Sequence, residues 1–379
     1  MKIAELKINK IAVWNTAFLG DAILTLPLIQ SLRLAYPGAS LHFYTRKGFA
    51  VLFREHPALQ EVYEYDKSTG AVSRSGFAEL LDFGRTLKNR KYDLWVSCHR
   101  SLRSAFLARA AAAPCRIGYS GSYKSLWFSR FFYTHLVDRR FSGLDEIERL
   151  LQLLKPLRLK ELSSWPNLRL PEAALRKAGQ LLGITDGAQG RKAIAGLHPG
   201  SVWATKRWPV EYFARIGVQA VQRGARVAIF AGPGEEPMAD RLEVLIRQSL
   251  GQGNPDSSAV RNPVLNPVIN LAGALSLTEL AACISLLDCY VSNDSGPMHL
   301  AWAQRVPLVA LFGPTVPALG FAPRGENSVL LEQADLPCRP CGLHGSAECK
   351  FKHHRCMRDL TPDKVWPEVV KRLFPATLL

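Results

Sequence analysis

The chain has 379 residues, of which 47% are apolar and 21% are charged. That length is too great for one typical domain and sufficient for two, each with its own core. The N-terminal stretch has charges spread through it, and the longest uncharged stretch, 306–323, is interrupted by prolines and glycines. We therefore expect a soluble chain with no signal peptide and no membrane-spanning helix.

The positive charge is large and unevenly distributed. Lys and Arg number 48 against 32 Asp and Glu, a net charge of +16. Residues 85–140 alone hold twelve basic and two acidic residues, a balance of +10. Such a field indicates an anionic partner: nucleic acid, an anionic membrane surface or a phosphorylated substrate. Aromatic and basic residues interleave at 122–137, which suits a membrane interface or ordinary core packing equally well.

The first half of the chain alternates strands with helical stretches. Residues 8–14, 40–48 and 92–99 are typical of buried strands, and 20–38 is typical of a helix ended by Pro37 and Gly38. This alternation indicates βαβ units and a parallel sheet. The pattern weakens over 156–192. We place the domain boundary there, with domains at 1–175 and 176–379 and the option that the last helix packs back on the first domain.

The second half repeats the alternation. Strands are predicted at 192–200, 225–232, 268–273, 289–292 and 307–313, and helices at 209–223, 236–250, 276–287 and 297–305. A polar loop at 251–267 interrupts the series. We predict an α/β fold of two Rossmann-like parallel-sheet halves facing across a cleft, with ligands beyond the carboxyl ends of the strands.

Polar residues gather at those carboxyl ends. The first strand leads to an acidic residue near a helix start, and three strands of the second half lead to turns with Gly, Ser, Lys or acidic residues. The residues are Asp21; Ser201, Thr205 and Lys206; Glu235 and Glu236; and Asp294, Ser295 and Gly296, with His299 shortly after. One Asp or Ser before a helix is usually only an N-cap, but four such turns on one side of a double sheet indicate a shared ligand.

The composition of these turns favours a nucleotide diphosphate. Backbone N–H groups at a helix start lack intrahelical partners and bind anions, and a nearby Lys adds positive charge. Acidic residues after a strand suit ribose hydroxyls. Neither GxGxxG nor GxxxxGK[ST] is present, which argues against a dehydrogenase and a P-loop phosphotransferase.

Five stretches resemble a known family. Residues 20–41, 197–216, 227–236 and 290–315 are similar to motifs of the ADP-heptose:lipopolysaccharide heptosyltransferases of glycosyltransferase family 9. A cysteine-bearing stretch, 337–365, resembles the second heptosyltransferase branch. The order of the motifs is kept from about residue 10 to about residue 370.

The resemblance implies a GT-B fold with an N-terminal acceptor domain, a C-terminal nucleotide-sugar domain and no obligatory catalytic metal. It implies that Asp21 is the general base for the acceptor hydroxyl. It also implies that Lys206 and Ser201, with Thr205 in the same loop, bind the diphosphate of the leaving ADP. The remaining donor contacts that it implies are Asp294, Ser295 and Gly296 for sugar and phosphate with His299 nearby, Glu236 or Glu235 for ribose, and the backbone near Leu275 for adenine.

The implied reaction is an inverting transfer of heptose from ADP-heptose to the lipid A–inner core of lipopolysaccharide. The basic first domain would then serve an anionic acceptor at the cytoplasmic face of the inner membrane, with the protein peripheral to it. Family members commonly carry a basic residue in the loop before the Gly-Asp pair, whereas "NTAFLGD" (15–21) has none.

The eight cysteines fall into two groups. Four lie in apolar runs and are expected in the core. The others form C-x2-C-x7-C-x6-C, a spacing with a CxxC knuckle but no match to common zinc modules. A structural metal site and a thiol-rich basic loop are both compatible, and the loop is favoured. This second group is Cys338, Cys341, Cys349 and Cys356.

Three other functions stay open. A relative could transfer another nucleotide-linked sugar, or could heptosylate a protein. A non-catalytic sugar-nucleotide sensor or scaffold would keep the turns that bind the nucleotide diphosphate but would not need both Asp21 and Lys206. A nucleic-acid-binding protein would explain the charge, but no recognised module is present, so we expect no nucleic-acid partner.

Overall fold

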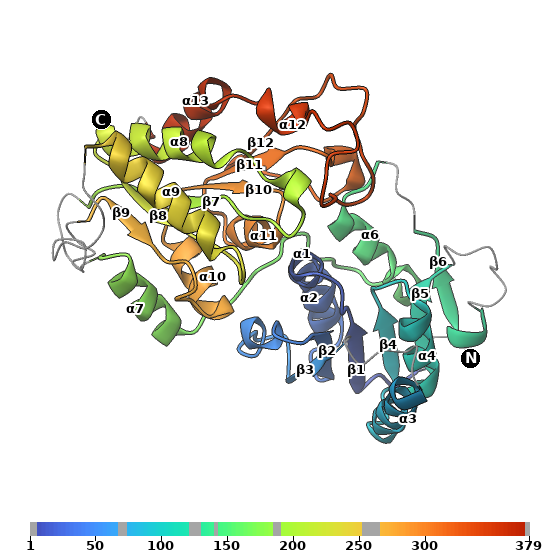
Figure 1. Ribbon diagram of the computed structural model, residues 1–379. Coiled ribbons are helices and arrows are strands. Elements are labelled where there is room, and N and C mark those ends of the chain that lie inside the picture. Colours follow the sequence, from blue (N-terminus) through green and yellow to red (C-terminus); the bar gives the residue numbers. More distant parts are fainter. Residues whose placement is uncertain are drawn as a thin grey trace. The chain divides into compact units, whose positions relative to one another are not determined.

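The computed structural model describes residues 6–66, 74–120, 130–139, 143–184, 191–251 and 266–375 (Figure 1). The chain divides into two compact units, Met1–Arg169 and Leu170–Leu379. Parts of the predicted aromatic segment 122–137 and most of the loop 251–267 lie outside the described residues. Within the described part, no helix combines the length and the apolar composition needed to cross a bilayer.

The first unit is built on a parallel sheet of six strands in the order β3-β2-β1-β4-β5-β6. Lys10 pairs with Ser40, and Ile11 with Leu94, which places β1 at the centre. The strands are β1 (Lys10–Trp14), β2 (Ser40–Arg46), β3 (Glu61–Tyr65), β4 (Leu94–Ser97), β5 (Cys115–Tyr119) and β6 (His135–Val137). The helices are α1 (Leu19–Leu24), α2 (Leu26–Ala35), α3 (Arg74–Asn89), α4 (Leu102–Ala110) and α6 (Glu146–Gln152), with 3-10 turns η2 (Ala50–Leu52) and η3 (Lys155–Leu157).

Local chemistry explains two features of this unit. The predicted helix 20–38 is in fact two helices, because Pro27 lacks the N–H that a continuous helix needs and the Thr25 hydroxyl donates back to the Asp21 carbonyl at 2.7 Å. Apolar side chains fill both faces of β1, as expected for a strand covered on both sides. On one face, the ring of Trp14 lies 5.7 Å from Trp95.

The second unit repeats the plan. Its sheet has the order β12-β11-β10-β7-β8-β9, with all strands parallel. The strands are β7 (Ile194–His198), β8 (Arg226–Ile229), β9 (Val268–Asn270), β10 (Cys289–Asn293), β11 (Leu308–Phe312) and β12 (Ser328–Glu332). The helices are α7 (Glu172–Leu181), α8 (Val210–Gln222), α9 (Glu236–Ser249), α10 (Leu277–Ser285), α11 (Gly296–Ala303), α12 (Arg355–Arg358) and α13 (Pro362–Leu373), with η4 (Ala204–Lys206) and η6 (Pro317–Leu319).

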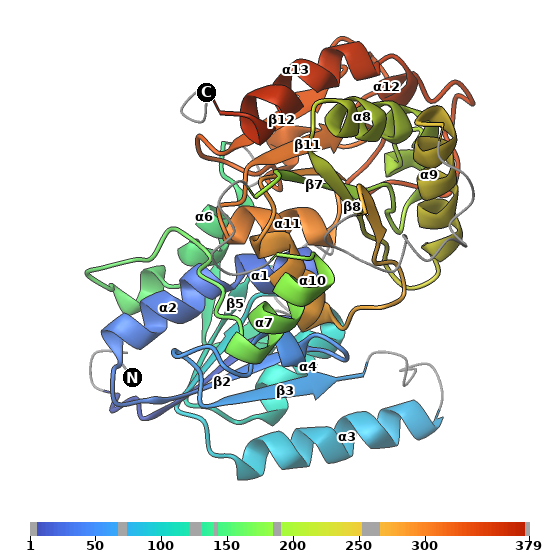
Figure 2. The same cartoon turned by 90° about the vertical axis from the view of Figure 1, so that its left-hand side faces the viewer.

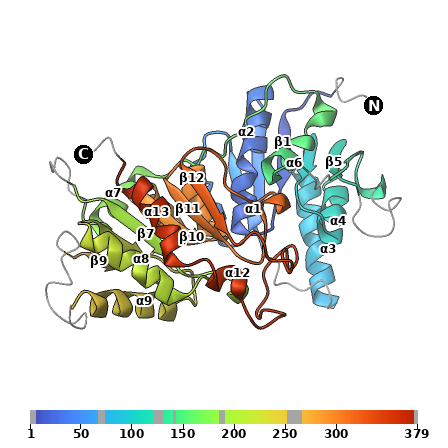
Figure 3. The ribbon, with the colours of Figure 1, turned by 90° about the horizontal axis from the view of Figure 1, so that it is seen from above.

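Helices cover both faces of this second sheet. Helices α8, α9 and α13 pack together over one face, and α13 rests on α8, β10 and β11 of its own unit (Figures 2 and 3). Residues of α7 contact α10, and α10 contacts α11, which in turn packs on β10 and β11. The odd residues of β7, such as Leu197, enter the core beneath α8, and Ile246 of α9 packs in the same core.

The two sheets confirm the predicted α/β architecture, and both have the same strand order when each is counted from its own first strand. In each sheet, the two central strands are the first and the fourth strand of that unit in sequence order. Connections leave these two strands in opposite directions, so their carboxyl ends open a crevice in which ligands of such sheets bind. The pairs are β1 with β4 and β7 with β10.

Candidate functional site

An ion pair lies at the carboxyl ends of β7 and β10. The Nζ atom of Lys206 is 2.5 Å from Oδ2 of Asp294, and the Thr315 hydroxyl donates to the same oxygen at 2.7 Å. All three side chains are buried. The three residues come from separate segments: η4 after β7, the end of β10, and the turn after β11. The strand ends therefore bring together a cation (Lys206), a carboxylate (Asp294) and a hydroxyl group (Thr315).

Asn293 fixes the loop that brings Lys206 there. Its amide nitrogen donates to the carbonyls of Pro199 and Gly200 at 2.8 and 3.2 Å, and its oxygen accepts from the N–H of Trp208 at 3.0 Å. The 199–208 loop is thus tied to β10 at both of its ends. Because Asn293 is fully buried, these hydrogen bonds are not shared with water and hold the loop in one conformation.

Helix α11 begins beside the ion pair. Ser295 is its N-cap residue, and its side chain does not cap the helix; Pro297 stands in the first turn. The half-buried start of this eight-residue helix presents backbone N–H groups and partial positive charge that can bind an anion. Ser201 is buried in the loop after β7, and its carbonyl accepts from Nε of Arg207 at 2.8 Å.

His299 lies one turn into α11 and is buried and neutral. Burial lowers its pKa to about 4; the nearby Lys206 acts in the same direction, and Asp294 opposes it. Its Nδ1 atom is buried without a hydrogen-bond partner within the described part of the chain. An orphan ring nitrogen of this kind indicates a contact that a ligand would complete.

The two adjacent acids after β8 have different surroundings. Glu235 accepts from the N–H of Gly232 at 2.9 Å and lies 3.6 Å from Nε2 of His198. Burial raises the pKa of Glu235, but the nearby His198, the hydrogen bond from Gly232 and the charge of Arg207 outweigh it, so the pKa lies below its usual value. A Cβ atom on Gly200 would lie 1.9 Å from this carboxylate, so a larger residue there would force the Glu235 side chain to move. Glu235 therefore shapes the loop.

Glu236 points to a different neighbour. Its side chain lies against the turn at Gly273, where an added Cβ would be 3.4 Å from its Cγ. Gly273 has a φ of +69°, a conformation that glycine adopts at no steric cost. Leu275 follows two residues later and is half-buried. Glu236 and the Leu275 backbone thus come from adjoining turns.

The cysteine-bearing segment, residues 338–354, packs against the loop that carries Lys206. The Thr205 N–H and hydroxyl both donate to the carbonyl of Ser346, at 3.1 and 2.9 Å, and Nε2 of His354 lies 2.8 Å from the Thr205 carbonyl. Between these contacts, Gly345 passes so close that an added Cβ would lie 2.6 Å from the Cβ of Trp203. Thr205 is therefore held by this segment.

One arginine of the same segment holds the turn that carries Thr315. Arg339 donates to the carbonyls of Gly313 and Thr315, the latter at 2.7 Å, and pairs with Glu332 at 2.6 Å. Its side chain is almost wholly buried. The segment 338–354 thus braces two of the three parts of the ion-pair site.

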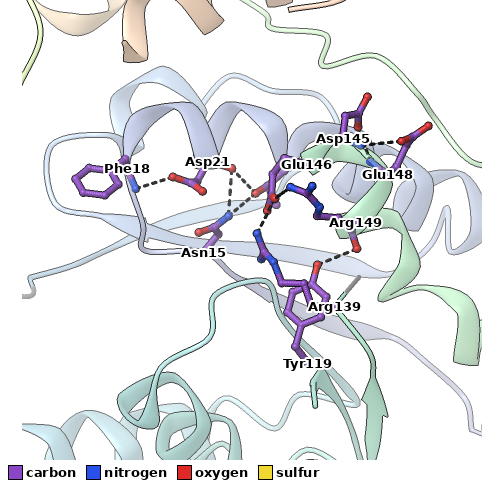
Figure 4. A network of polar contacts seen from close by, with 10 residues as sticks. Asn15, Phe18, Asp21, Tyr119, Arg139, Asp145, Glu146, Glu148 and Arg149 are labelled. Carbon is purple, nitrogen blue, oxygen red and sulfur yellow. Dashed lines mark hydrogen bonds and ion pairs between the residues drawn. The ribbon is translucent and has the colours of Figure 1, made fainter. Parts of the chain in front are cut away.

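In the first unit, the loop after β1 holds Asp21 (Figure 4). The amide nitrogen of Asn15 donates to the Asp21 carbonyl at 3.1 Å and to the Thr25 hydroxyl at 2.8 Å. The N–H of Phe18 donates to Oδ2 of Asp21 at 3.2 Å, which closes the first turn of α1. Asp21 is half-buried, so its carboxylate is held in place yet remains accessible.

A buried ionic cluster adjoins Asp21 in the same unit (Figure 4). Glu146, the first residue of α6, lies 2.6 Å from Arg139 and 3.4 Å from Arg149. Burial raises the pKa of Glu146, the charge of Asp21 adds to this rise, and the two guanidiniums oppose it; the net direction is upward. Sequence reasoning did not single out any of these three residues.

Comparison with known proteins decides the family. The model of glycosyltransferase family 9 (heptosyltransferase) matches residues 80–352. The chain belongs to that family. It is 26% identical over 376 residues to a lipooligosaccharide heptosyltransferase 2 of Campylobacter jejuni, a match that covers 97% of this chain and 100% of the relative. Family 9 enzymes are glycosyltransferases, and so is this one.

Solved structures of the family share the fold. A family 9 glycosyltransferase from Veillonella parvula aligns with a TM-score of 0.79 at 24% identity, covering 98% of this chain and 99% of that one. The ADP-heptose lipopolysaccharide heptosyltransferase II of E. coli aligns with a TM-score of 0.73 at 22% identity, covering 96% and 98%. The predicted GT-B architecture is thereby confirmed.

The family 9 enzyme keeps its four late cysteines as free thiols. Within the described residues, no group of three or more Cys, His, Asp or Glu side chains has a metal-binding arrangement. Burial raises the pKa of Cys341 and Cys356, and the neighbouring thiols add to the rise. Burial acts in the same direction on Cys349, but hydrogen bonds from the backbone that follows outweigh it and lower its pKa.

The structure brings together most of the predicted donor residues. Those at the carboxyl ends of β7 and β10 meet around the start of α11, and Glu236 and Leu275 share adjoining turns after β8 and β9. Asp21 lies in the first unit, in the corresponding loop after β1. Sequence reasoning missed three residues that organise the site: Asn293, Thr315 and Arg339. Thr315 follows the end of β11, so the strand-end rule that selected its neighbours could have found it.

Proposed function

We propose that this enzyme transfers heptose from ADP-heptose to the inner core of lipopolysaccharide, with inversion at the anomeric carbon. The observation that carries the proposal is the buried Lys206 cation held by Asp294 at the open start of α11. A diphosphate can bind the Lys206 ammonium group and the partial positive charge of the helix start, and a bacterial lipooligosaccharide heptosyltransferase is similar to this chain along its whole length.

The donor would lie across the carboxyl end of the second sheet. Lys206 and Ser201 would hold the diphosphate together with the N–H groups of Ser295 and Gly296 at the helix start, while Thr205, whose hydroxyl is bound to Ser346, would hold the loop in place. The ribose would bind Glu236, and adenine would meet the backbone near Leu275. Asp294 and the neutral imidazole of His299 would then accept or donate hydrogen bonds to sugar hydroxyls. Glu235 stays a loop residue in this scheme, because its carboxylate is already engaged.

The chemical step is one displacement. An acceptor hydroxyl oxygen forms a bond to the anomeric carbon while the bond from that carbon to the diphosphate oxygen breaks. Asp21 takes the hydroxyl proton as general base, and ADP leaves with the electron pair. Lys206 and the helix start stabilise the charge that develops on the leaving group. These groups supply the positive charge that a metal ion would supply elsewhere, so we propose metal-independent transfer.

The acceptor would be the anionic lipid A–core, bound by the basic first unit at the cytoplasmic face of the inner membrane. Two large apolar side chains of this unit are strongly exposed: Leu102, at 70%, and Phe131, at 68%. The guanidinium of Arg109 lies 5.8 Å from the Phe131 ring. Exposed apolar groups beside arginines suit a surface of anionic lipids. We therefore propose peripheral attachment through α4 and Phe131.

Nucleotide binding tests the donor assignment. Calorimetry with ADP, UDP, GDP and CMP should show selective binding of ADP. Lys206→Ala should weaken it by about tenfold or more, since a charge-assisted contact to phosphate is lost. Lys371→Ala, which changes an exposed lysine of α13, is the matched control and should bind like the wild type. Preference for another nucleotide would keep the fold and reject ADP-heptose as donor.

Transfer assays test the chemistry. With ADP-heptose and a lipid A–core acceptor, Asp21→Asn should lose at least about a hundredfold in kcat while ADP affinity is unchanged, as expected when a general base is removed. Activity should survive a chelator. Selective ADP binding without transfer to a lipid or a protein would favour the scaffold alternative, and transfer only to a protein would replace the acceptor.

A further inference from the structure

The ionic cluster beside Asp21 is built more tightly than a surface ion pair. The side chain of Glu146 is 3% exposed and that of Arg149 is fully buried, while Arg139 retains 13% exposure. Arg139 also lies over the ring of Tyr119 at 5.1 Å, and the Tyr119 hydroxyl donates to the Arg149 carbonyl at 2.8 Å. Isolated charges are costly to bury, so a cluster of three needs a reason in the fold or in the function.

The groups that face Glu146 can be named from each neighbouring element. Figure 4 shows Asp21 of α1 beside it; Arg139 pairs with it from the segment after β6, and Arg149 follows it on α6. Cys98 after β4 and Tyr119 of β5 complete its surroundings, and burial raises the pKa of both well above neutrality. The ion pairs of the cluster thus join one carboxyl group, that of Glu146, to two guanidinium groups in the neighbourhood of Asp21 (Figure 4).

Removal of the Glu146 charge would take from Arg139 and Arg149 a carboxylate that lies 2.6 and 3.4 Å from them, and would make the surroundings of Asp21 more positive by one charge. An opposite charge within a few ångströms favours the ionised form of a carboxylate and weakens it as a base. With Glu146 present, the net charge of the cluster is +1 instead of +2.

We propose that Glu146 is a positioning residue for Asp21: by neutralising part of the charge of Arg139 and Arg149, it keeps the Asp21 carboxylate basic and available to the acceptor hydroxyl. The inference rests on the proposed role of Asp21. Coulomb interactions act equally on both partners, so the charge that Asp21 exerts on Glu146 is matched by the effect of Glu146 on Asp21.

Three variants change the charge of the cluster in known directions. Glu146→Gln raises its net charge to +2, and Arg139→Gln lowers it to 0. The double variant Glu146→Gln with Arg149→Met restores +1 without Glu146. The measurement is the acidic limb of the pH profile of kcat/KM, which reports the apparent pKa of the base in the free enzyme.

We expect the acidic limb of the kcat/KM profile to shift with the net charge of the cluster. Glu146→Gln should move it to lower pH by about one unit, with a lower rate on the plateau. Arg139→Gln should move it to higher pH, and the double variant should lie close to the wild type. A purely structural role for Glu146 would lower activity in the single and double variants alike without this order. Shifts of both single variants in the same direction, or no shift in either, would overturn the proposal.

Two controls keep the test decisive. ADP binding by the second unit and the circular dichroism of each variant show whether the chain is folded. If Glu146→Gln does not fold, Arg139→Gln still tests the direction of the shift of the acidic limb, because Arg139 is the partly exposed residue of the cluster. An unmoved acidic limb in Arg139→Gln would overturn the inference. Asp21→Asn separates the two claims. If it remains active, the proposed base is wrong; if it is inactive and the limb of the other variants is unmoved, only the inference about Glu146 fails.

Discussion

Thr315 is a small residue on which the donor site depends. Its hydroxyl donates to the oxygen of Asp294 that also pairs with Lys206. Thr315→Val keeps the shape and removes the donor. The lost hydrogen bond to a buried carboxylate should cost about 1.5–3 kcal/mol, so we expect kcat/KM to fall by roughly 10- to 150-fold as Asp294 and Lys206 lose their alignment.

Kinetics and ADP calorimetry on the same preparation check this expectation. Thr315→Ser retains the hydroxyl and is the matched control; it should keep most of the activity. Equal losses in the Val and Ser variants would show that the methyl group, not the hydrogen bond, matters at this position.

Residue identities at the strand ends could be predicted, but side-chain directions could not. Lys206 and Asp294 follow from the rule that ligands bind beyond the carboxyl ends of parallel strands. The choice between Glu235 and Glu236 depends on how one helix start is oriented, which adjacent acids do not reveal. Glu146 and its two arginines look like ordinary surface charges in the sequence. Only the packing of α6 against the chain near Asp21 shows that they are buried.

At the scale of elements, the segment 338–354 acts as a brace for the donor loop. Gly345→Ala tests it, because the new Cβ would lie 2.6 Å from the Cβ of Trp203 and 3.0 Å from Cγ of Lys206. Neither atom is the free end of a flexible side chain, so the loop must shift. Overpacking of this kind costs about 1–3 kcal/mol. We expect weaker ADP binding, by roughly tenfold, in a protein that still folds.

The control for this variant is Gly38→Ala. A Cβ there would meet nothing within 4 Å, so both stability and ADP binding should stay at wild-type values. Calorimetry gives the affinity, and thermal unfolding shows whether the Gly345 variant is folded. Unchanged ADP affinity in Gly345→Ala would mean that the segment covers the Lys206 loop without positioning it.

The elements differ in how far their sequences reveal them. The central strands β1, β7, β10 and β11 are short apolar runs and were predicted within about two residues of their ends. Outer strands such as β3 and β12 were missed, since their side chains are mostly half-buried and their sequences lack a clear apolar run. The helix break at Thr25 was missed because Pro27 is also acceptable in the first turn of a helix.

For the whole molecule, the main physical asymmetry is charge. The net charge of +16 would attract any anionic surface weakly, so a specific lipid contact must be separated from this general attraction. Arg109→Glu and Arg176→Glu make the same change in net charge, from +16 to +14. Arg109 lies on α4 beside Phe131 in the first unit, whereas Arg176 is an exposed residue of α7 in the second.

Sedimentation with vesicles of neutral phosphatidylcholine, alone or mixed with anionic phosphatidylglycerol, distinguishes these sources. We expect the wild type to bind the anionic vesicles in a salt-dependent manner, and Arg109→Glu to bind severalfold more weakly, since each basic residue near an anionic surface contributes about 1 kcal/mol. Phe131→Ser should weaken binding at every salt concentration, because apolar contact is not screened. If Arg176→Glu reduces binding as much as Arg109→Glu, net charge alone explains the attraction. Equal binding to neutral and anionic vesicles would exclude an anionic lipid surface as the partner of this unit.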